Sequence, residues 1–194
     1  MTCDQTVNFF LQKGAGFSQV FRWGQPVFAW KSITAVPSVL PVHLTVTAHS
    51  IPSGWPFAVL GVLGTTQLNR DDPPYYATVI DVDTIEINDL DGSSFSTYVS
   101  GGAIRFNIPV DLAGSTAKLQ VRASLNSAVL LTLTSSSGIT IDNTAKTITV
   151  VFTAAQIAAL GVAQAVYSLQ MTSSGGIPTQ LVSGSIFIES EATV

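Results

Sequence analysis

Charge is scarce in this chain. Only 10% of its 194 residues are Asp, Glu, Lys or Arg, whereas soluble domains ordinarily carry about 25%. The eight basic residues stand singly along the sequence, so no basic stripe follows a phosphate backbone and nucleic-acid binding is not expected. A surface with so little charge favours a component of an assembly over a freely diffusing enzyme.

Long hydrophobic runs are also missing, although 46% of the residues are hydrophobic. The longest candidate, residues 57–64, is far shorter than the roughly 18 apolar residues that a membrane span needs, so no membrane partner is expected. The N-terminus has no basic segment before an apolar stretch, and no secretory signal is expected. The apolar residues are instead spread over short segments, which suits sheets that meet other subunits.

Cysteine and histidine are almost absent. Cys3 is the single cysteine, so the monomer has no internal disulfide, and a free thiol fits synthesis in a reducing cytosol. His43 and His49 are the two histidines. Zinc sites normally need three or four ligands, so no metal site is expected. For His49 we expect a hydrogen bond that fixes a turn beside Pro52.

Motifs of catalysis are not found either. The sequence has no Gly-x-Ser-x-Gly elbow and no phosphate-binding glycine loop before a helix. Glu86 and Asp83 stand at an odd separation, which places them on opposite faces of a strand. The acidic run 88–92 does not fit an EF-hand, because Ile87 and Tyr98 would occupy ligand positions. We expect no enzyme activity, no catalytic residue and no cofactor.

The chain does contain a succession of short segments rich in Val, Ile, Thr and aromatic residues. Clusters of Gly, Ser, Asn and Asp separate them, a pattern typical of β-sandwiches and small barrels. The expected strands are residues 7–11, 17–23, 44–47, 57–62, 76–82, 84–88, 103–107, 116–123, 129–134, 147–152, 165–171 and 181–188.

One short helix is predicted after Thr153. Thr153 and Gln156 match a capping box, Ile157 and Leu160 supply an apolar edge, and Gly161 is a natural stop. In the strand that follows, we expect Tyr167 to be buried with its hydroxyl bonded to nearby backbone, as in immunoglobulin-like domains.

Two sets of segments carry family resemblances. The first resembles a small immunoglobulin-like domain of tail and baseplate-associated structural proteins of tailed bacteriophages. Its segments are residues 13–17, 21–23, 109–122, 131–134, 137–141, 153–160, 166–171 and 181–188. The second is similar to a small β-barrel module common in phage tail and fibre proteins. Its segments are residues 33–36, 42–49, 62–69, 77–87 and 96–102.

The resemblances imply an all-β chain in which one module interrupts another. An immunoglobulin-like β-sandwich with one short helix would comprise residues 1–30 and 108–194, and an inserted small β-barrel domain residues 31–107. Loops tolerate long insertions at small entropic cost when their ends lie close together. Seven of the twelve acidic residues lie between Asp71 and Asp91, a shift in composition that also indicates a separate unit.

Aromatic residues gather in the first eighty positions. Exposed, they would form an interface or stack on sugar rings; buried, they would be core. The candidate interface residues are Trp23, Trp30, Trp55, Phe57, Tyr75 and Tyr76.

The resemblances imply a structural virion protein that is assembled in the host cytoplasm. We expect a multi-copy adaptor of the tail, baseplate or tail-fibre attachment, which packs against other virion proteins and further copies of itself. The alternatives are a capsid decoration protein and a receptor-binding or glycan-binding module of the tail.

Overall fold

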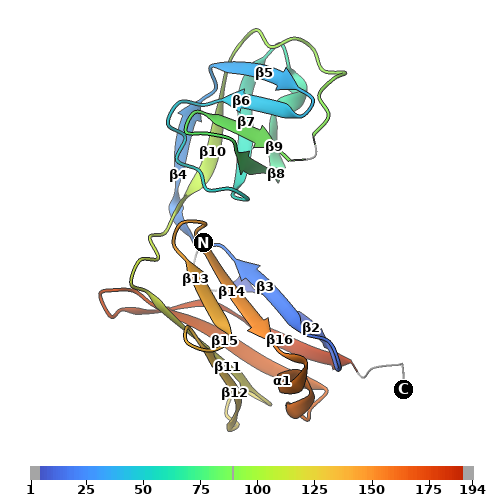
Figure 1. Cartoon of the computed structure of the whole chain (residues 1–194), viewed down its shortest axis with the longest axis vertical. Coiled ribbons are helices and arrows are strands. Elements are labelled where there is room, and N and C mark those ends of the chain that lie inside the picture. The colour runs from blue at the N-terminus through green and yellow to red at the C-terminus, as the bar shows by residue number, and fades with distance from the viewer. Residues whose placement is uncertain (1–4, 89, 190–194) are drawn as a thin grey trace. The chain divides into compact units, whose positions relative to one another are not determined.

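The chain folds almost entirely as β-structure. The computed structural model describes residues 5–88 and 90–189, and 58% of the chain is in strands with one short helix (Figure 1). The predicted all-β fold class is therefore confirmed. Cys3 lies outside the described residues.

Two compact units make up the molecule, and one interrupts the other in sequence. Unit 1 comprises Met1–Trp23 and Val110–Val194, and unit 2 comprises Gly24–Pro109. The structure thus places the borders seven residues before and two residues after those expected from the sequence. The difference arises because the strand Gly24–Ser32 pairs within unit 2, although its first residues had been assigned to the sandwich.

Unit 1 is a sandwich of a six-stranded and a three-stranded sheet. The larger sheet has the order β1-β16-β15-β11-β12, and β2 also pairs with β16. Its strands are β1 (Gln5–Thr6), β2 (Phe9–Gln12), β11 (Thr116–Arg122), β12 (Val129–Thr134), β15 (Gln164–Thr172) and β16 (Pro178–Glu189). The smaller sheet has the order β13-β14-β3. Its strands are β3 (Phe17–Phe21), β13 (Ile139–Asp142) and β14 (Thr147–Phe152).

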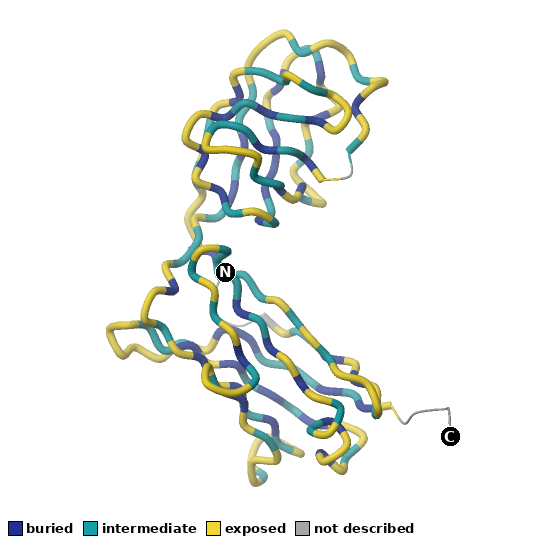
Figure 2. Tube along the Cα trace, viewed as in Figure 1, coloured by how far each residue is buried: buried dark blue, intermediate teal, exposed yellow. Residues whose placement is uncertain are grey.

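Strict alternation of apolar and polar residues builds this sandwich. In β11 the side chains of Ala117, Leu119 and Val121 are buried, and the residues between them face outward. Period-2 alternation turns one face of a strand inward. The larger sheet therefore meets Ile148 and Phe152 of the smaller sheet in one hydrophobic core, which Figure 2 shows as alternating buried and exposed positions.

The short helix forms where its capping residues predict it. Helix α1 spans Ala154–Ala159, and Thr153 is its N-cap. The Gln156 amide donates to Thr153 Oγ1 at 3.2 Å, and the Thr153 amide donates to Gln156 Oε1 at 2.9 Å. This reciprocal pair satisfies two backbone donors that the first turn leaves open. The predicted capping box is confirmed.

Unit 2 is a seven-stranded sheet that curls back on itself. The strand order is β4-β10-β7-β8-β9-β6-β5. The strands are β4 (Gly24–Ser32), β5 (Ala35–Val39), β6 (Val42–Thr45), β7 (Pro56–Leu63), β8 (Arg70–Val79), β9 (Thr84–Ile87) and β10 (Ser100–Pro109), with a 3-10 turn η1 (Thr66–Leu68). Ile33 and Thr34 alone separate β4 from β5, so the first and last strands of this order follow each other end to end along the chain. Ile33 N donates to Gly102 O at 2.9 Å, and Thr34 N donates to Thr45 O at 2.9 Å.

The curled sheet encloses a second hydrophobic core. Trp55 lies at its centre, fully buried together with Leu44, Leu68 and Ile85. The indole Nε1 of Trp55 donates to the Asn107 carbonyl at 2.9 Å, so the largest core side chain also has its polar atom satisfied. Each unit therefore has a hydrophobic core of its own.

Tyr167 ties the start of the chain into unit 1. Its ring is buried and stacks on Phe9, with ring centroids 4.3 Å apart, and its hydroxyl donates to the Val7 carbonyl at 2.8 Å. Burial raises the pKa of the Tyr167 hydroxyl, so the group keeps its proton and remains a donor. The expected burial and hydrogen bond to backbone are confirmed, but the acceptor lies 160 positions earlier in the sequence and not a few residues upstream, as it does in the corner motif of immunoglobulin-like domains.

Replacing Tyr167 by Phe removes this donor and leaves a backbone acceptor unpaired in a partly buried site. We expect Tyr167→Phe to lower the free energy of unfolding of unit 1 by about 1–3 kcal/mol, measured by urea denaturation with far-UV circular dichroism. Tyr76→Phe is the matched control, because the Tyr76 side chain is half exposed. Equal stabilities for the two variants would contradict the assigned role of Tyr167.

Candidate interaction surface

The structure separates the six aromatic candidates into core and surface residues. Trp55, Phe57 and Tyr75 are 1%, 1% and 3% exposed, so they belong to the core of unit 2 and offer no interface. Trp23 packs partly buried against the core of unit 1. Only Trp30 and Tyr76, at 56% and 52%, present their rings to solvent. The predicted interface is corrected to these two residues and their neighbours.

Tyr75 shows why one of these candidates is unsuited to binding. The Arg70 guanidinium lies 3.6 Å from the centroid of the Tyr75 ring, and the Phe57 ring centroid is 5.9 Å away. Burial raises the pKa of the Tyr75 hydroxyl, and the positive charge of Arg70 partly opposes that shift. The ring is therefore enclosed by its own unit.

A compact aromatic surface lies on β4 and β10. Trp30 and Phe28 are two residues apart on β4, so their side chains share one face, and Arg105 pairs with Trp30 across the sheet. The Arg105 guanidinium lies 4.7 Å from the Phe28 ring centroid and 5.7 Å from that of Trp30. It also forms an ion pair with Asp71. We call Phe28, Trp30, Asp71 and Arg105 the aromatic face.

A hollow of about 320 Å³ adjoins this face. Phe28 and Arg105 line one side, and Pro56, Pro74 and Asp71 line the other. Tyr76 lies nearby, opposite Pro56 in the register of β7 and β8. Because the Asp71 carboxylate neutralises the guanidinium, the surface offers rings, proline and a paired charge. Such a lining suits an apolar, uncharged segment of a partner.

Strand β4 also leaves one of its edges unpaired. Among the described residues it pairs with β10 alone and is the end strand of the sheet. Val27, Phe28 and Trp30 are all exposed on it. Long, apolar, exposed edges invite pairing with another chain, and folded proteins usually blunt or cover them.

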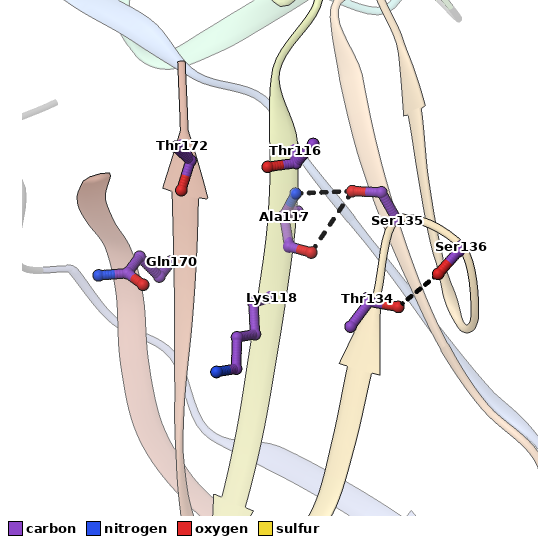
Figure 3. Close-up of a pocket in the computed structure, with 8 residues that line it drawn as sticks. All are labelled: Thr116, Ala117, Lys118, Thr134, Ser135, Ser136, Gln170 and Thr172. Atoms are coloured by element: carbon purple, nitrogen blue, oxygen red, sulfur yellow. Dashed lines mark hydrogen bonds between the residues drawn. The ribbon is translucent and has the colours of Figure 1, made fainter. Parts of the chain in front are cut away.

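Unit 1 carries a second, polar surface on the outer face of its larger sheet. Three adjoining hollows of about 380, 170 and 220 Å³ follow β11 and β15. The first and second share Lys118 and Gln170, and the second and third share Gln120. In the first hollow, Ser135 Oγ bonds both the amide and the carbonyl of Ala117 (Figure 3). No acidic residue is among the described residues that line the three hollows, so Lys118 and Arg122 face no counter-charge there. This groove suits a polar or anionic ligand.

The two histidines have separate structural partners. His43 Nε2 lies 3.1 Å from Glu86 Oε2. The buried His49 accepts from the Ile51 amide at 3.1 Å, and its Nε2 lies 2.8 Å from the Asp81 carbonyl. The predicted turn-fixing hydrogen bond of His49 is confirmed. Within residues 5–88 and 90–189, no three His, Cys, Asp or Glu side chains gather in a group able to hold a metal ion.

The acidic turns also have structural roles. The Asp83 amide donates to Asp81 Oδ1 at 2.8 Å and lowers the pKa of that carboxyl. Hydrogen bonds from Ser93 lower the pKa of Asp91 in the same way. Asp83 Oδ1 in turn accepts from the Ala48 amide at 2.7 Å. These carboxylates hold turns, while Asp89 lies outside the described residues.

No protein-family model matches the chain, and no curated protein matches its sequence. No helix of the described residues has the length and apolar character to cross a bilayer.

Substitution of a surface tryptophan and substitution of a core tryptophan should change the stability of the protein by very different amounts. We expect Trp30→Ala to change the free energy of unfolding by less than about 1 kcal/mol, the cost of an exposed cation–π contact. Trp55→Ala should cost about 3–5 kcal/mol, because it opens a cavity and leaves the Asn107 carbonyl without its donor. Urea denaturation followed by far-UV circular dichroism measures both. Similar losses in the two variants would show that Trp30 is a packing residue.

Proposed function

We propose that the chain is a structural protein of a tailed-phage virion, a multi-copy adaptor at the tail, baseplate or tail-fibre attachment. It acts by packing against other virion proteins and performs no reaction. The observation that carries this proposal is the aromatic face beside the unpaired edge of β4. A small charge-poor protein keeps such a surface at a cost in solubility, and cover by another chain removes that cost.

The composition of the aromatic face supports a protein–protein contact. Residues that dominate binding energy at interfaces are enriched in Trp, Tyr and Arg, and lie where water is excluded. Trp30 and Tyr76 are exposed, and Arg105 is held in place by two rings and Asp71. A fixed guanidinium loses less side-chain entropy when a partner covers it.

The topology of unit 1 supports the immunoglobulin-like part of the proposal. The N-terminal strands β1 and β2 run parallel to the last strand, β16, while β15 and β11 continue the same sheet antiparallel. The remaining strands β3, β14 and β13 form the facing sheet. A buried tyrosine in the penultimate strand bonds to the backbone of the N-terminal segment.

The insertion supports an adaptor that carries two functions on one chain. Trp23 and Val110 end the two segments of unit 1, and the Val110 amide donates to the Trp23 carbonyl at 2.9 Å. The two points at which the chain passes between unit 1 and unit 2 are therefore adjacent. In the proposal, unit 2 contributes the aromatic face, and unit 1 contributes the polar groove along β11 and β15 as an independent contact.

Quantitative mass spectrometry of purified virions tests this function. Tailed particles are purified from the phage or lysogen that encodes the chain, and we expect its peptides at several copies per particle. Gold labelling should then place the chain on the tail. A label on the head lattice would instead establish a capsid decoration protein, and purified particles without the chain would refute a virion role.

A variant of the aromatic face tests the surface itself. We expect particles of a phage that encodes Phe28→Ser together with Trp30→Ser to contain at least about tenfold fewer copies of the chain, since interface anchors each contribute about 1.4 kcal/mol or more. Ile177→Ser is the control, because Ile177 is also an exposed apolar residue but lies in unit 1. Full incorporation of the double variant would remove the aromatic face from the proposal. Retained incorporation with lost adsorption to host cells would favour a receptor or glycan site there.

A further inference from the structure

The hydrogen bonds of β4 show which of its backbone groups are free. Ile33 N donates to Gly102 O, in the same antiparallel register in which Trp30 pairs with Arg105 and Phe28 with Asn107. Groups on an antiparallel strand alternate in direction. Between Phe28 and Ser32, where the pairing is regular, Ala29 and Lys31 therefore bond β10, and the amides and carbonyls of Phe28, Trp30 and Ser32 point to the open edge.

We propose that the open edge of β4 pairs with the same strand of a second copy, antiparallel and centred on Ala29. This inference rests on the proposed function, since it names one partner of the aromatic face. In this register Phe28 of each copy is opposite Trp30 of the other, and both are residues whose backbone groups are free. The edge is thus complementary to itself, which is the requirement for a two-fold symmetric contact.

The outer face of this pair brings the exposed rings together. Phe28 and Trp30 lie on one face of β4, so each Phe28 ring meets the Trp30 ring of the other copy. Aromatic cross-strand pairs are among the stabilising contacts of antiparallel sheets. The Arg105 guanidinium of each copy lies beneath them and is already neutralised by Asp71. The contact therefore buries aromatic rings and brings no unpaired Arg105 guanidinium of one copy close to that of the other.

The side chains on the opposite face of the paired strands also fit one another. Ala29 and Lys31 share this face by strand alternation, and Ala29 packs against the core of unit 2. In the proposed register Ala29 meets Ala29 of the second copy, and Lys31 meets Val27. The alkyl stem of a lysine covers apolar surface while its ammonium group stays in water. Like charges are not placed opposite each other, and Pro26, which has no amide proton, ends the pair.

Cysteine cross-linking of the full-length chain tests the register. In a background with Cys3→Ser, which removes the single native cysteine, Ala29→Cys places two thiols on a non-hydrogen-bonded pair. Their Cα atoms would be about 4.5 Å apart, within reach of a disulfide. Val27→Cys is the control on the same strand, because its two thiols would be about 13 Å apart. We expect at least about tenfold more oxidised dimer from Ala29→Cys.

Sedimentation velocity over a concentration series tests the edge independently. Ser32→Pro removes an amide that faces the open edge and that β10 does not use, so the fold should tolerate it. We expect the dimer of the wild-type chain to be lost in Ser32→Pro and retained in Ser32→Ala, with unchanged circular dichroism for both variants.

The outcomes separate the inference from the proposed function. A wild-type chain that stays monomeric at all concentrations, or equal cross-linking of Ala29→Cys and Val27→Cys, would overturn the pairing of two copies. If particles nevertheless lose the Phe28→Ser, Trp30→Ser variant, the proposed function stands and another virion protein occupies the edge. If purified particles lack the chain altogether while the dimer forms, the pairing stands and the virion role fails.

Discussion

The fold depends on one backbone hydrogen bond at the base of the insertion. The amide of Val110 and the carbonyl of Trp23 meet at 2.9 Å, which brings together two residues that are far apart in sequence. With the ends of unit 2 held side by side, closing unit 1 around them costs little loop entropy. Each unit can then complete a core of its own, one around Tyr167 and Phe9, the other around Trp55.

The division into two units affects how many apolar residues remain on the surface of each. A small unit buries a smaller fraction of its surface than a large one, and unit 2 must place its apolar residues on a sheet of seven short strands. Most of them enter the core, but β4 has three consecutive exposed residues, Pro26, Val27 and Phe28, and then exposes Trp30. Unit 2 thus keeps apolar side chains on its surface at the edge of its sheet.

Much of this architecture can be read from local sequence. Strict alternation predicted β11, β14 and β15, because a half-buried strand imposes period 2. The capping box of Thr153 and Gln156 located the helix, because the donors of a first turn need partners nearby in sequence. Strand β4 is absent from the expected strands, since its sequence shows no alternation of apolar and polar residues. Its pairing with β10 is set by residues about eighty positions away.

The candidate surface was harder to foresee than the fold. The sequence singled out six aromatic residues as one group, yet composition does not tell which side of a strand faces the core. Tyr75 and Tyr76 are adjacent, and alternation buries the first and exposes the second. Arg105 and Asp71 are 34 residues apart and meet only through the register of the sheet. A pair of aromatics two residues apart, Phe28 and Trp30, was the one local signal of a shared face.

The scarcity of charge connects these observations. Where carboxylates occur, they hold turns, as Asp81 and Asp91 do, or neutralise a cation, as Asp71 does for Arg105. Little charge then remains to steer an encounter over long distances, so association depends on shape, rings and open backbone groups. Such contacts form slowly and respond weakly to salt. These properties suit a subunit that stays bound in an assembly, because such a subunit needs a low dissociation rate more than a high association rate.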